Sequence, residues 1–170
     1  RDPSMALPWV ILVDGARHQL DIILELVGRC RPGATVIVDI IHVLEYLAKA
    51  GRALVRGNRA ELEAWVSEHL LEILRGRCVA VAASLRAHAN RLGLRGSARE
   101  SVDDAVSYLE TYAEFMRYDV YLAAGYPIAT GVIEGACRYL VKDRMEITGA
   151  RWCLGSAEAV LRLRSLWASG

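Results

Sequence analysis

The stretch WVILVDGARHQLDIILELVGRCRPGATVIVDI, residues 9–40, decides the fold. It begins with the apolar run WVILV at 9–13 and ends with ATVIVDI at 34–40. Short continuous apolar runs are typical of strands buried on both faces, and the residues between the two runs repeat apolar side chains at helical spacing. A strand, a helix and a strand within roughly 30 residues predict a βαβ unit, with parallel strands and a right-handed crossover.

Polar side chains stand at both predicted strand ends. Asp14 follows the first strand and precedes Gly15, and ligands of α/β sheets bind at the carboxyl ends of the strands. Asp39 ends the second strand, and His42 opens a helix expected to run to about Val55. Two interpretations of Asp39 and His42 stay open. They bond to each other or lie near a metal, or Asp39 caps the helix with His42 in its first turn.

The region 59–125 has no strand pattern. Its apolar residues recur every three or four positions, which predicts a block of roughly three helices inserted after the βαβ unit. The chain is therefore expected to be α/β in class and mostly helical by content. Basic side chains gather around a break at residues 93–97, and both a solvated surface and a DNA-facing patch fit them: Arg86, His88, Arg91, Arg95 and Arg99.

The segment YPIATGVIEGACRYLVKDRM, residues 126–145, predicts a helix with one acidic residue, Glu134, near its start. Arg138 and Lys142 follow at helical spacing, so the carboxylate and both cations share one face. A carboxylate can hold a divalent metal and a row of cations can hold a phosphate backbone, but the same pattern also suits a solvated surface. Trp152, beside Arg151, either stacks on an unpaired base or packs in a core before a last helix at about 155–167.

The residues GVIEGACRYLVKDRMEITGARW, 131–152, resemble the glutamate-bearing motif of bacterial insertion-sequence transposases of the ISKra type, relatives of the Mutator-like DDE transposases. The resemblance implies a partial RNase H-like fold, a short parallel sheet with a large helical insertion. Residues 1–57 would be the βαβ portion that carries the second acidic residue, and 58–125 the insertion. Residues 126–170 would hold the catalytic helix and the final helix.

The resemblance also implies a function, DNA strand cleavage and transfer by two-metal phosphodiester chemistry. Asp14 in LVDG matches the second aspartate of the family and Glu134 in GVIEG matches its final glutamate, so both would be catalytic and would hold Mg²⁺ or Mn²⁺. The spacing of Asp39 and His42 resembles an accessory Asp/Cys-x-x-His element of several DDE superfamilies. The residues that would bind DNA are Arg138, Lys142, Arg144, Arg151 and Trp152.

The same resemblance sets the expected partners and one expected defect. The partners are DNA, as element terminal repeats and target, and further copies in a homo-oligomer of the full-length protein. The first aspartate of the family's triad lies on an earlier strand that this chain lacks, so we expect little or no strand cleavage from the fragment. One alternative is a non-catalytic DNA-binding or interaction remnant of a transposase. Two others are a helical interaction module and a phosphatase or nuclease of another α/β class.

Composition bounds these interpretations. The 170 residues are 54% hydrophobic with a net charge of +1, which favours a globular domain and gives no overall sign of nucleic-acid binding. The four cysteines form no Cys-x-x-Cys pair, which argues against zinc and predicts buried free thiols in a reducing cytoplasm. No run approaches the roughly 20 apolar residues of a membrane span. The first residue, Arg1, suggests a piece of a longer product.

Overall fold

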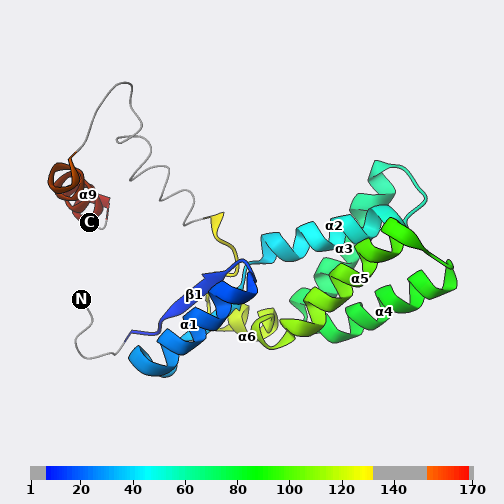
Figure 1. Cartoon of the computed structure of the whole chain (residues 1–170), viewed down its shortest axis with the longest axis horizontal. Coiled ribbons are helices and arrows are strands. Elements are labelled where there is room, and N and C mark those ends of the chain that lie inside the picture. The colour runs from blue at the N-terminus through cyan, green and yellow to red at the C-terminus, as the bar shows by residue number, and fades with distance from the viewer. Residues whose placement is uncertain (1–6, 132–152, 169–170) are drawn as a thin grey trace. The chain divides into compact units, whose positions relative to one another are not determined.

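The computed structural model describes residues 7–131 and 153–168 (Figure 1). The chain falls into two compact units, the first ending at Ala129 and the second beginning at Thr130. Within the described residues, the first unit is mostly helical and contains a two-stranded parallel sheet, while the second contains helix α9, Leu154–Ala168. None of the described helices has the length and apolar character to cross a membrane.

The sheet confirms the predicted βαβ unit. Strand β1, Val10–Val13, runs parallel to β2, Thr35–Val38, with Val10 opposite Thr35 and Val13 opposite Val38. Helix α1, Arg17–Cys30, connects them. The second strand is shorter than the predicted run 34–40 because Asp39 already caps the following helix.

The region after the sheet is helical, as predicted. Helix α2 spans Ile40–Leu54, α3 Arg59–Leu74, α4 Cys78–Arg91 and α5 Gly96–Thr111. A 3₁₀ turn at Ala113–Phe115 and the short helix α6, Tyr118–Ala123, follow. In place of roughly three helical segments after residue 58, the described chain thus has three long helices and two short ones. Helix α2 packs on α3 and α5, and α4 packs on the same two helices (Figure 1).

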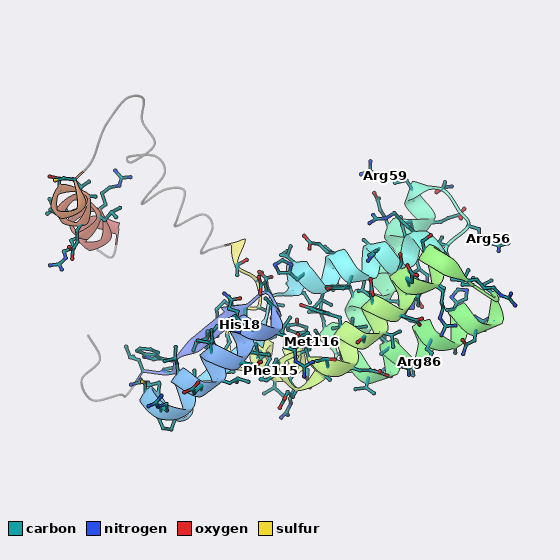
Figure 2. All side chains as sticks on the ribbon, viewed as in Figure 1. His18, Arg56, Arg59, Arg86, Phe115 and Met116 are labelled. Carbon is teal, nitrogen blue, oxygen red and sulfur yellow. The ribbon has the colours of Figure 1, made fainter. Side chains whose placement is uncertain are left out.

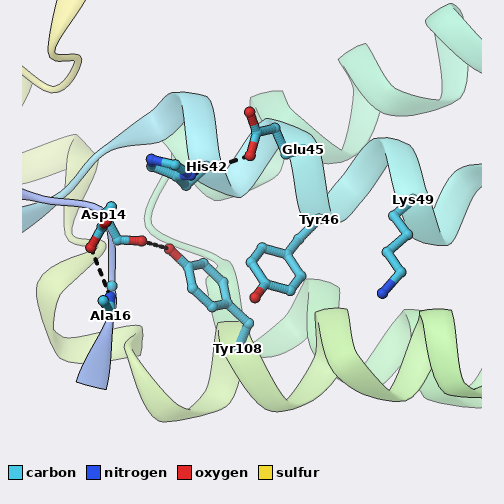
Figure 3. Close-up of a pocket in the computed structure, with 8 residues that line it drawn as sticks. Asp14, Ala16, His42, Glu45, Tyr46, Lys49 and Tyr108 are labelled. Carbon is cyan, nitrogen blue, oxygen red and sulfur yellow. Dashed lines mark hydrogen bonds and ion pairs between the residues drawn. The ribbon is translucent and has the colours of Figure 1, made fainter. Parts of the chain in front are cut away.

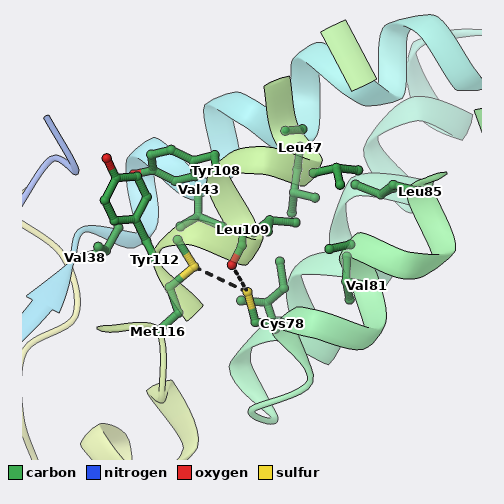
Figure 4. Packing of buried hydrophobic residues seen from close by; sticks show 14 of the residues in the cluster. Val38, Val43, Leu47, Cys78, Val81, Leu85, Tyr108, Leu109, Tyr112 and Met116 are labelled. Atoms are coloured by element: carbon green, nitrogen blue, oxygen red, sulfur yellow. Dashed lines mark hydrogen bonds between the residues drawn. The ribbon is translucent and has the colours of Figure 1, made fainter. Parts of the chain in front are cut away.

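One hydrophobic core runs from the sheet into the helices (Figure 4). Val38 of β2, Leu47 of α2 and Leu109 of α5 are all fully buried members of it. The helices therefore do not form a separate globule; they share their core with the βαβ unit, which fixes α2 and α5 beside the strand ends.

The cysteine prediction is partly wrong. Cys78 is a buried free thiol that donates to the Leu109 carbonyl at 3.4 Å, and burial raises its pKa to about 11. Cys30 and Cys153 are free but exposed. Cys30 is the last residue of α1, and Cys153 immediately precedes α9, so both lie at helix ends. Cys137 lies outside the described residues.

Candidate functional site

A cleft of about 410 Å³ opens at the carboxyl end of β1, between the turn that follows the strand and helices α2 and α5 (Figure 3). The turn contributes three residues and the two helices contribute the rest. The lining residues are Asp14, Gly15, Ala16, His42, Glu45, Tyr46, Lys49 and Tyr108.

Asp14 reaches this cleft with its side chain exposed. One carboxylate oxygen, Oδ1, accepts a hydrogen bond from the backbone N–H of Ala16 at 2.8 Å. Ala16 is the N-terminal cap of α1, so this bond folds the chain from the strand into the helix. The carboxylate is thus held at the strand end, where a parallel sheet presents its ligand-binding groups.

Tyr108 of α5 holds the same turn from the other side. Its hydroxyl donates to the backbone carbonyl of Asp14 at 2.9 Å, a contact between residues 94 positions apart (Figure 3). Its ring stacks on Tyr46 with centroids 4.0 Å apart. Burial raises the pKa of Tyr108, so the phenol stays a protonated donor at neutral pH.

Gly15 is required by this contact. Its φ of +84° lies in the left-handed region, and a Cβ at this position would lie 2.7 Å from the Tyr108 hydroxyl oxygen. A side chain would therefore meet both backbone strain and a steric clash.

The exposed face of α2 supplies the far wall of the cleft. His42 Nδ1 lies 3.2 Å from Glu45 Oε2, and Lys49 Nζ donates to Asp104 Oδ2 on α5 at 2.7 Å. The hydrogen bond from Lys49 to Asp104 raises the pKa of that lysine, so it remains charged. On this wall, Glu45 therefore has His42 as its partner, and Lys49 has Asp104.

Asp39 caps helix α2, as the second interpretation of the sequence predicts. Its side chain is 1% exposed and accepts from the Ile41 N–H at 2.8 Å, and His42 lies in the first turn. Asp39 is absent from the cleft lining, whereas His42 is part of it. An accessory catalytic role for either residue stays a prediction.

The basic residues around the turn between α4 and α5 are partly neutralised by acids. Arg86 of α4, labelled in Figure 2, donates to Glu110 of α5 at 2.7 Å. Arg99 donates to Asp103 at 2.8 Å and to Asn90 at 2.7 Å. Exposed pairs of this kind contribute little to stability and reduce the local positive charge, which favours a solvated surface over a DNA-facing patch.

The second half of the predicted site lies outside the described residues. This holds for Glu134, Arg138, Lys142, Arg144, Arg151 and Trp152. Among the residues that are described, no group of three or more His, Cys, Asp or Glu side chains could hold a metal ion. The described part of the chain therefore offers Asp14 as one oxygen ligand, with Glu45 and His42 on the same cleft.

Several cleft residues were missed by the sequence analysis. Three of them follow His42 at three, four and seven positions, which is the spacing of one helix face: Glu45, Tyr46 and Lys49. This spacing could have identified them from the sequence. Tyr108 has no local signal, because its partners come from the turn after β1 and from α2.

The chain matches no protein-family model, no curated protein and no solved structure. Evidence on function therefore comes from the sequence and from the geometry of the cleft.

Proposed function

We propose that this chain is part of a DDE transposase that cleaves and transfers the DNA of an insertion sequence. In this proposal the βαβ unit belongs to an RNase H-like sheet, and helices α3 to α6 are the insertion. The proposal rests on the resemblance of residues 131–152 and on one structural observation. The carboxylate of Asp14 is exposed at the carboxyl end of a parallel strand and lines a cleft.

One carboxylate of the cleft, that of Asp14, is a ligand of the kind that a hard cation prefers. Mg²⁺ prefers oxygen ligands, keeps several waters and is commonly held by one or two carboxylates together with substrate phosphates. Asp14 supplies one such carboxylate, and Glu134 would supply the second. Ions held by these carboxylates would supply activation of the attacking hydroxyl and stabilisation of the leaving oxygen in an in-line displacement at phosphorus.

The remaining proposed contacts are with DNA. Arg138, Lys142, Arg144 and Arg151 would neutralise backbone phosphates, and Trp152 would stack on an unpaired base. The resemblance matches two of the three acidic residues of the family's triad to this sequence, so we expect little or no strand cleavage from these 170 residues. Metal-dependent nicking by this chain that disappears in Asp14→Ala would contradict that expectation.

The proposal is tested by calorimetric titration of the chain with MnCl₂. Asp14→Asn should weaken Mn²⁺ binding by about tenfold or more, because it removes an anionic ligand. The matched control is Asp21→Asn, which removes an exposed aspartate on α1 that does not line the cleft. Equal Mn²⁺ affinities in the two variants would overturn the metal role of Asp14.

A further inference from the structure

Two tyrosines of the helical region hold the carboxyl ends of the two strands. Tyr118 on α6 donates to the carbonyl of Val38, the last residue of β2, at 2.8 Å. Tyr108 on α5 donates to the carbonyl of Asp14, one residue beyond β1, at 2.9 Å. Both rings are buried, with 0% and 7% exposed, and both hydroxyls donate to a backbone carbonyl, so the two contacts are alike in donor and acceptor. They differ in the residue that they hold, since Val38 is a core residue and Asp14 lines the cleft.

We propose that Tyr108 is the positioning residue for the Asp14 carboxylate. The inference rests on the proposed function, in which that carboxylate binds the metal. Tyr108 would not touch metal or DNA; it would act through the peptide unit that follows Asp14.

The turn is held at two points that enclose a single residue. Tyr108 binds the carbonyl of Asp14, and the Ala16 N–H binds Oδ1 of the same aspartate. Only Gly15 lies between them, in a left-handed conformation and with no room for a Cβ on the side of Tyr108. Moving the Asp14 carbonyl therefore also moves the N–H that orients its carboxylate.

Tyr108 is itself a fixed point. Tyr46 stacks on its ring at 4.0 Å and an interplanar angle of 16°, while Tyr112 packs edge-on with centroids 5.0 Å apart. Rings packed in this way have little freedom to rotate. The packing of α2 and α5 thus fixes the Tyr108 hydroxyl. That hydroxyl in turn fixes the Asp14 carbonyl at the end of β1 where the metal is proposed to bind.

The first test needs no metal. Tyr108→Phe removes the hydroxyl and keeps the ring, and Tyr118→Phe removes the equivalent hydroxyl at β2. Both variants lose one hydrogen bond from a buried tyrosine to a backbone carbonyl, so their overall stabilities should fall by similar amounts. Amide hydrogen exchange of Ala16, measured by NMR, should accelerate roughly fivefold to tenfold more in Tyr108→Phe than in Tyr118→Phe. Equal acceleration in both variants would show that Tyr108 is merely structural and would overturn the proposal.

The second test separates this inference from the proposed function. MnCl₂ added to the wild-type chain should broaden the amide resonances of Gly15 and Ala16, and its apparent affinity should fall about tenfold in Tyr108→Phe and less than about twofold in Tyr118→Phe. Absence of broadening in the wild type would contradict the metal site, while Ala16 exchange would still decide whether Tyr108 positions Asp14. Broadening with the same affinity in both variants would retain the metal site and reject the positioning role.

Discussion

Gly15 has a φ of +84° and lies under the hydroxyl of Tyr108, so two independent constraints act on one residue. Gly33 provides a contrast. Its φ of +94° imposes the same kind of backbone constraint, but nothing lies within 4 Å of the position that its Cβ would occupy. The pair therefore separates the cost of a left-handed conformation from the cost of the contact with Tyr108.

Gly15→Ala should be more destabilising than Gly33→Ala. Both variants strain the backbone by about 1–3 kcal/mol, and the alanine at position 15 adds overpacking against Tyr108 of about 1–3 kcal/mol. The free energies of unfolding, measured by urea denaturation monitored by circular dichroism, should differ by that second amount. Similar losses in the two variants would mean that Tyr108 does not lie against the turn.

The start of α2 shows how a single buried side chain sets the boundary of an element. Asp39 is 1% exposed and its carboxylate accepts from the N–H of Ile41. Asn58 caps α3 in a comparable way, accepting from the N–H of Glu61 at 3.1 Å, but it is exposed. A buried cap cannot be replaced by water, so the two caps should contribute differently.

Asp39→Ala should lower the free energy of unfolding by about 2 kcal/mol, and Asn58→Ala by about 1 kcal/mol or less. Asp39→Asn keeps an oxygen acceptor for Ile41 and should lose under about 1 kcal/mol. Thermal and urea unfolding of the three variants measure these differences. If Asp39→Asn loses as much as Asp39→Ala, the charge of Asp39 rather than the cap stabilises this end of the helix.

The elements themselves were largely predictable. The apolar runs at 9–13 and 34–40 and the helical spacing between them identify the βαβ unit, because local patterns decide which faces must be buried. The helical block was predictable for the same reason. The end of the second strand was overestimated because Asp39, three residues before His42, already serves as the cap of α2.

The cleft was predictable only in part. Asp14 could be assigned to a strand end because Asp-Gly directly follows an apolar run. Tyr108 could not be assigned to the same site, since a hydrogen bond across 94 residues depends on how α5 packs against α2 and leaves no periodic pattern. Tyr46 lines the cleft and stacks on Tyr108, a contact that depends on the same packing of the two helices.

At the scale of the whole molecule, the first unit supplies a rigid strand end and the proposal requires a second acid from further along the chain. The shared core, from Ile37 of β2 to Leu85 of α4, fixes the helices that wall the cleft. Asp14 is thereby held at the cleft by elements that share one hydrophobic core. The proposed activity depends on whether Glu134 binds the same ions.

The most direct measurement is the Mn²⁺-induced broadening of the Gly15 amide resonance in the wild-type chain and in Glu134→Gln. If Asp14 and Glu134 share the ions, removal of the Glu134 charge should lower the apparent Mn²⁺ affinity measured at Gly15 by about tenfold or more. The same affinity at Gly15 with and without the Glu134 carboxylate would contradict the two-metal site and the transposase assignment that depends on it.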